Sequence, residues 1–375
     1  MDIFKQEFKK LRASPILIVF LALCFGFNLI IMSGYNSYPD YVAEASRTAG
    51  YKLGAEFDEK VAELEPSEFR DWLAESTTGK TDIFDDYETT YIADAYIKQL
   101  GLTGYAADAT RTKYEQLQKS VDTKAETDES LTLYFADATE DMHRNLHGNT
   151  MKYLLLECAL LAALIMLLSV GYEHHNRTSH VVYATKTGRN IMRYKMFASL
   201  TAGLAAFVVL NAPTLAFYFL VNDYGGILDS SVSSVFHYFM DYIVGGQRPF
   251  VTWQSFTVLT YLLASLGICA LLTLCFGLLA FAVGLWVKNS YIGFFVFIII
   301  NAGCVVLALV ILGLLQNFLM LSPVWLWLKQ GYWFSDGGPD ILWKNFETFG
   351  ALASLLILAV LCAVSAVTFR KRNIA

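Results

Sequence analysis

The chain has 375 residues, of which 55% are hydrophobic and 17% are charged, and its mean hydropathy is +0.43. It is too apolar for an ordinary soluble protein of this length, so the composition indicates a membrane protein. The net charge of −6 combines an acidic stretch, residues 34–150, with a basic remainder. Because the basic residues flank apolar segments and do not alternate with aromatics on one polar surface, nucleic-acid binding is not expected.

Residues 1–33 predict a short amphipathic helix followed by a first transmembrane span. A helix with a basic face and an apolar face is typical of a segment lying on an anionic membrane surface. The uncharged run Pro15–Met32 is long enough to cross a hydrocarbon core of about 30 Å. A cleaved signal peptide is the alternative, but this run is long for one and no A-x-A-like site follows it. The apolar face of the first helix carries Ile3, Phe4, Phe8 and Leu11.

Residues 34–150 form an insert that carries 24 acidic and 11 basic residues, a net charge of −13. Strongly acidic segments can be disordered. However, Tyr87, Tyr91 and Tyr96 recur near helical spacing, and the insert is rich in helix-favouring residues. We therefore expect a helical domain between the first two spans.

Two motifs in the insert have weak chemical interpretations. Gly79-Lys80-Thr81 is the end of a phosphate-binding loop, but Ala74 replaces its first glycine, so any ATP is expected to be bound by another chain. His143 and His147 have metal-ligand spacing on a helix, with Asp141 as the nearest further ligand. The glutamate of H-E-x-x-H is absent, and we expect a solvated helix face there. The sequence predicts no metal site, no cofactor in this chain and no catalytic residues.

Residues 151–375 predict five further spans. Tyr153–Val170, Phe197–Val221 and Phe349–Phe369 are three of them. The uncharged runs of 39 and 40 residues on either side of Lys288 each hold one span and additional apolar chain. The second run ends with Ser322-Pro323 and several tryptophans, which predict an interfacial or re-entrant helix. The expected fold class is all-α, a six-helix polytopic membrane protein with a large helical extracytoplasmic insert between spans one and two.

Lysine and arginine gather in alternate connections, which fixes the expected orientation. If both termini are cytoplasmic, every inside segment is basic, and the insert lies outside. We expect a multi-pass protein of a bacterial cell membrane. The cations assigned to the cytoplasm are Lys5, Lys9, Lys10, Arg12, Arg177, Lys186, Arg189, Arg193, Lys195, Lys288, Arg370, Lys371 and Arg372.

Four polar residues inside the predicted spans are candidates for a translocation path: Glu157, Asn28, Asn211 and Asn301. An ionisable group within a span is a functional hypothesis by default. The structural alternative, which we favour for Glu157, is that it reaches the outer interface or pairs with Lys152. The asparagines most often hydrogen-bond between helices.

The loop 172–195 is the most informative segment. It begins with Glu173 directly after a span and ends with Lys195 at the start of the next. This pattern resembles the permease subunits of type-2 ABC exporters, in which a glutamate after the second span starts a short amphipathic coupling helix, and a Ser/Gly-Arg element and a lysine follow. The overall layout of spans and insert is similar to that family too. The proline usual before the Ser-Arg pair of that family is missing here, and Lys186-Thr187-Gly188 stand in its place. The residues carrying the resemblance are Glu173, Thr178, Val181, Val182, Gly188, Arg189 and Lys195.

The resemblance implies a permease that pairs with itself or with a paralogous permease and docks onto two separate cytoplasmic ABC ATPase subunits, which bind the ATP. Two other classes stay open. The chain could be a membrane sensor or resistance protein whose outer domain binds a peptide or envelope ligand without transport, or a scaffold of an envelope machine. Lipid, peptide antibiotic, ion and drug cargoes all fit the sequence.

Overall fold

The computed structural model describes residues 2–32, 38–136, 142–185, 187–311 and 313–371. Gly34, Asp141, Lys186 and Arg372, which enter the sequence predictions, lie outside these residues. As predicted, the structure is mostly helical, and its described part holds six helices long and apolar enough to cross a membrane. These are α2 (Pro15–Met32), α8 (Met151–His175) with its leading π-helical turn η1 (Arg144–Thr150), α10 (Ile191–Val221), α11 (Val258–Trp286), α12 (Ser290–Val310) and α15 (Phe346–Lys371).

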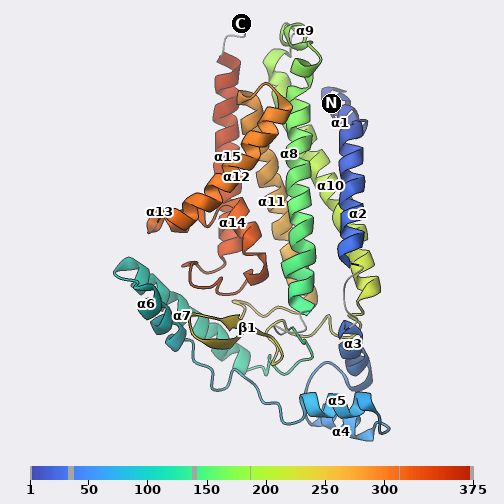
Figure 1. The fold of residues 1–375 in the computed structure, drawn as a ribbon, viewed down its shortest axis with the longest axis vertical. Coiled ribbons are helices and arrows are strands. Elements are labelled where there is room, and N and C mark those ends of the chain that lie inside the picture. The colour runs from blue at the N-terminus through green and yellow to red at the C-terminus, as the bar shows by residue number, and fades with distance from the viewer. Residues whose placement is uncertain (1, 33–37, 137–141, 186, 312, 372–375) are drawn as a thin grey trace.

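The spans form an elongated bundle with α8 and α11 at its centre (Figure 1). Helix α8 packs against α10, α11, α12 and α2, and α15 packs against α11. Small residues allow these helices to approach closely, as is common between membrane helices. A Cβ atom added at Gly293 of α12 would lie 3.0 Å from Leu167 of α8, and one at Gly203 of α10 would contact Ala162. The first helix, α1 (Asp2–Arg12), lies against α10 at the end of the bundle where α15 also finishes, here called the terminal end.

The described part of the insert is folded and helical, and it lies at the opposite end of the bundle (Figure 1). Ordinary local signals set its boundaries: the Ser67 hydroxyl accepts a bond from the Arg70 amide at the start of α5, and Gly101, in the left-handed conformation, ends α6. Its helices are α3 (Tyr38–Ala49), α4 (Ala55–Glu63), α5 (Glu68–Thr77), α6 (Thr90–Leu100) and α7 (Tyr105–Ala125).

The insert does not form its core alone. Tyr96 and Tyr114 of the paired helices α6 and α7 share one apolar cluster with Val251 and Trp253, which lie in the connection between α10 and α11. That connection also forms the antiparallel hairpin β1 (Tyr238–Asp241) and β2 (Gly246–Pro249). The domain at this end is therefore composite: the insert supplies its helices, and the later connections supply part of its core.

Buried polar contacts fasten this composite domain together. Arg248 donates to Asp241 at 2.8 Å and to Asp336, in the connection before α15, at 3.0 Å. The Lys113 ammonium of α7 donates to the carbonyl oxygens of Asp336, Gly338 and Ile341 at 2.8–3.1 Å. Burial lowers the pKa of Lys113 to about 8. Burial alone would raise the pKa of Asp336, but Arg248 and Lys113 hold it well below its ordinary value.

The surplus apolar chain after the fifth span forms two short helices: α13 (Leu314–Leu319), which contacts α12 and projects from the bundle, and α14 (Pro323–Leu328), which folds back onto it (Figure 1). Pro323 occupies the first position of α14, where its missing amide hydrogen costs no helical bond. Trp325 is buried, because α14 packs against α12, α15, α8 and α11.

Candidate functional site

The loop between α8 and α10 projects from the terminal end of the bundle and carries the short helix α9 (Ser179–Tyr183) at its tip (Figure 1). Backbone bonds fix its path: the Thr178 amide donates to the Glu173 carbonyl at 2.9 Å, and the Val182 amide donates to the Thr178 carbonyl at 3.0 Å. The loop is therefore a structured continuation of α8.

Lys195, at the start of α10, is the centre of a buried ion cluster beneath this loop. Its ammonium lies 2.8 Å from the carboxylate of Glu7 on α1 and 3.0 Å from that of Glu173 on α8, and it donates to the Ser169 carbonyl at 2.7 Å. The side chain is fully buried. The sequence predictions Glu173 and Lys195 are thus brought into direct contact, and three helices meet at one cation.

The cluster balances its own charge. The Lys10 ammonium of α1 lies 2.5 Å from the second oxygen of Glu7 and 3.6 Å from Glu173, so two carboxylates face two ammonium groups. Burial alone would raise the pKa of Glu7, but Lys195 and Lys10 lower it below its ordinary value. A set of paired charges tolerates burial better than a single unpaired charge.

Arg189 ties the other side of the loop to the last span. It lies in the 3-10 turn η2 (Gly188–Asn190) and donates to the carbonyl oxygens of Phe369 and Arg370 at 3.1 and 2.5 Å. These carbonyls belong to the C-terminal turn of α15, where a cation satisfies free acceptors and the helix dipole. Gly188 has φ +50, in the left-handed region that favours glycine, and this turn brings Arg189 to α15.

The remaining predicted coupling residues differ in their exposure. Val181 is 72% exposed at the tip of α9, and Val182 is half-buried against the bundle. Glu173 is 1% exposed, so its carboxylate pairs with Lys195 at the base of the loop and is not accessible to a partner protein. The available contact surface is α9 itself, and Glu173, Arg189 and Lys195 position it.

The sequence predictions missed Glu7. It lies one turn from both Ile3 and Leu11, so i, i+4 spacing puts all three on the face of α1 that meets α10. An acidic residue flanked at this spacing by two apolar ones is a detectable signal of a buried partner. The predicted apolar face grouped Phe4 and Phe8 with Ile3 and Leu11. Leu11 belongs to the core of the bundle and the partly buried Ile3 packs against it, whereas the partly buried Phe4 and Phe8 stack on each other.

Two of the four translocation-path candidates meet in the bundle. The Asn28 side-chain amide of α2 donates to the Glu157 carboxylate of α8 at 2.9 Å, and both residues are buried. The expected pairing of Glu157 with Lys152 is not seen within the described residues, because the Lys152 ammonium donates to the Leu328 carbonyl.

The other two asparagines bond chiefly to their own helices. Asn211 of α10 donates to the Phe207 carbonyl at 2.9 Å and lies 3.5 Å from the Cys158 sulfur of α8. Asn301 of α12 donates to the Phe297 carbonyl at 2.8 Å. Asn211 therefore faces α8, next to the Glu157 position, whereas Asn301 does not join the group.

The expected solvated face at His143 and His147 is also wrong. Both imidazoles are buried, and their ring centroids are 4.7 Å apart. The ring centroid of His237, from the connection before β1, lies 4.6 Å from that of His143. Tyr261 of α11 packs against the rings of His143 and His147. Tertiary packing from later connections covers these histidines, and the sequence around them does not show it. Burial lowers the pKa of His143 well below its ordinary value.

Comparison with known proteins adds no relative to this geometry: no family model, no curated protein and no solved structure matches the chain.

Proposed function

We propose that this chain is the permease subunit of an ATP-driven exporter, coupled to separate ATPase subunits through the loop between α8 and α10. The single observation that supports this most strongly is the construction of that loop. It presents an exposed short helix with Val181 at its tip, yet buried polar contacts fix its base to α1, α8, α10 and α15. A surface loop without a mechanical role has no need of such anchoring.

The anchoring suggests how force reaches the spans. A partner that pushes or pulls on α9 acts directly on the C-terminal end of α8 and the N-terminal end of α10. The Glu173–Lys195 pair keeps these two ends together, and Arg189 extends the connection to α15. Closure of an ATPase pair on ATP would therefore move spans two, three and six as a unit and open or close a path beside them.

The proposal requires the terminal end to face the cytoplasm and the composite domain to lie outside. The distribution of lysine and arginine supports that orientation. It also requires another chain to bind ATP, in keeping with the incomplete phosphate-binding motif at Gly79-Lys80-Thr81. The buried Glu157–Asn28 pair, with Asn211 close by, is the polar group best placed in the spans to line a path for the cargo.

Purification of the full chain from its native cells in mild detergent tests this directly. We expect an ATP-hydrolysing subunit to co-purify. Val181→Asp places a charge at the exposed tip of α9 without disturbing a buried group, so we expect it to abolish that co-purification. Tyr242→Asp is the matched control, because Tyr242 is 90% exposed in the hairpin at the opposite end. Equal recovery of the ATPase with both variants would contradict the proposal.

Arg189→Gln separates coupling from assembly. The α9 surface is retained, but the fixed connection to α15 is lost, so the complex should assemble while its ATP hydrolysis in proteoliposomes falls several-fold. Unchanged hydrolysis in an assembled Arg189→Gln complex would remove Arg189 from the coupling path.

A membrane sensor or resistance protein is the second candidate, and one observation favours it. The insert carries a net charge of −13; its Lys113 donates to the connection before α15, and its Tyr96 accepts a bond from Arg248 of the connection before α11. A cationic peptide bound to the insert could therefore act on the spans without transport. Recovery of the chain without an ATPase, together with saturable binding of a cationic peptide, would support the sensor over the exporter.

A further inference from the structure

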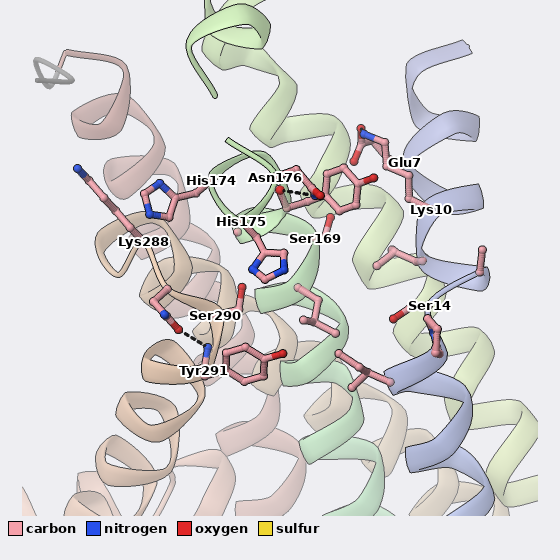
Figure 2. A pocket seen from close by; sticks show the side chains of 18 residues that line it. Glu7, Lys10, Ser14, Ser169, His174, His175, Asn176, Lys288, Ser290 and Tyr291 are labelled. Carbon is pink, nitrogen blue, oxygen red and sulfur yellow. Dashed lines mark hydrogen bonds and ion pairs between the residues drawn. The ribbon is translucent and has the colours of Figure 1, made fainter. Parts of the chain in front are cut away.

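A cavity of about 440 Å³ opens at the terminal end of the bundle, between the α1–α2 junction, the end of α8 and the start of α12. Figure 2 shows Lys288 and His174 on one side of it, Lys10 and Ser14 on the other, and Ser169 and His175 between them. The cavity is distinct from the exposed α9 surface.

Its polar lining is suited to an anion. Lys288 is exposed and forms no ion pair within the described residues, and His174, His175 and Asn176 are exposed beside it. Glu7 also lines the cavity, but its carboxylate is held by Lys10 and Lys195. Lys288 lies at the rim, and Figure 2 shows its exposed side chain extending outward, so a change of rotamer brings its free ammonium to a ligand in the cavity; no free carboxylate opposes it among the described lining residues.

A buried polar atom at the same place lacks a partner. Ser169 lines the cavity, the residue is 3% exposed, and within the described residues its buried hydroxyl has no hydrogen-bond partner. A buried hydroxyl without a partner is costly, so a ligand that accepts its hydrogen bond is favoured. A phosphate oxygen is such an acceptor.

The cavity continues into an apolar stripe along α8. Four leucines, each four residues from the next, are only partly buried, whereas most of the helix between them is buried: Leu156, Leu160, Leu164 and Leu168. This spacing puts them on a continuous face, and Leu168 also lines the cavity. At the level of the cavity the stripe lies between α2, which contributes Ile16, and α12, which contributes Tyr291.

An anion site that opens onto an apolar stripe at the end of a set of membrane spans matches one class of ligand. We propose that the cavity binds the phosphate headgroup of an anionic phospholipid, with an acyl chain packed along the stripe of α8. Basic pockets between membrane helices at the interface bind such headgroups. Lys288 supplies the charge, and the Ser169 hydroxyl donates to a phosphate oxygen. This inference does not depend on the exporter proposal, because it concerns only this chain and the bilayer.

The test is native mass spectrometry on the delipidated full chain, titrated with phosphatidylglycerol and with phosphatidylcholine of the same acyl chains. We expect one saturable phosphatidylglycerol site and weaker phosphatidylcholine binding. Lys288→Gln should weaken phosphatidylglycerol binding roughly fivefold, the effect of about one interfacial cation. Lys371→Gln removes an equal charge from the same end, on exposed Lys371 of α15, and should leave the affinity unchanged.

Three results would overturn the proposal. One is equal affinity for the two lipids, which would show that the site does not recognise the anionic headgroup. Another is an equal effect of the Lys288 and Lys371 substitutions on lipid affinity, which would show that binding depends on general surface charge and not on this cavity. The third is competition by glycerol phosphate or inorganic phosphate at the concentrations at which the lipid binds, which would make this a site for a soluble phosphate.

Discussion

At the residue scale, Lys195 is fully buried, and its one ammonium group forms ion pairs with two carboxylates. Lys195→Ala leaves Glu173 buried without its closest cation. Removing one partner of a buried pair costs about 3–5 kcal/mol, so the variant should unfold at a markedly lower temperature in detergent. Lys371→Ala, at an exposed position of the same end, should leave the melting temperature within error.

A second substitution separates charge from packing in this cluster. Lys195→Met with Glu173→Gln removes one cation and one anion together, and Lys10 still pairs with Glu7. The double variant should therefore be more stable than Lys195→Met alone, as a double-mutant cycle would measure. If the two substitutions destabilise additively, the two groups are not coupled in the folded protein.

Glu157 offers a further prediction at this scale. Glutamine keeps an oxygen that accepts the bond from Asn28, whereas Glu157→Leu leaves the Asn28 amide buried and unpaired. Unfolding measurements should show little change for Glu157→Gln and a loss of about 1–3 kcal/mol for Glu157→Leu. If Glu157→Gln also lowers transport while stability is kept, the carboxylate belongs to the cargo path. Equal stability of the two variants would contradict the bond seen here.

At the element scale, the contact between the insert and the connections before α11 and α15 depends on pH through Asp336. Its pKa is lower in the folded protein than its ordinary value of 3.8. The stabilisation it gives is therefore present above about pH 3.8 and is lost as the pH falls below that value. We expect the melting temperature of the full chain to decrease when the pH is lowered below about 4.

Asp336→Asn should flatten this acid dependence, because asparagine does not titrate. Asp94→Asn, at an exposed position of α6, is the control and should keep the acid dependence of the unchanged chain. An equally steep acid loss in Asp336→Asn would assign the effect to other carboxylates.

The same contact shows what sequence reasoning can and cannot predict. The spans and the helical insert were predictable because hydrophobic length and helical period are local properties. The composite core was not, because Val251 and Trp253 lie more than a hundred residues along the chain from α6 and α7, the insert helices that they pack against. The sequence did not predict the burial of His143 for the same reason: the residues that cover it lie far along the chain. In the loop 172–195, the sequence singled out Glu173 and Lys195, but it did not identify their partner Glu7 on α1.

At the scale of the whole molecule, the two ends of the bundle are built differently. The terminal end presents a short exposed helix on a buried ionic base, and the opposite end is closed by a composite domain whose polar contacts span three connections. The central spans α8 and α11 connect the two ends (Figure 1). Under the exporter proposal, the first end receives movement from an ATPase and the second controls release of the cargo.

The most direct measurement is cross-linking from Val181. The six native cysteines lie in the spans, and five of them are buried, so Val181→Cys places the one readily accessible thiol on α9. In membranes from native cells, a thiol–amine cross-linker should join Val181→Cys to an ATP-hydrolysing subunit, whereas Tyr242→Cys at the opposite end should not. A Val181→Cys protein that labels fully but never yields an ATPase adduct would contradict the assignment of this loop as a coupling element.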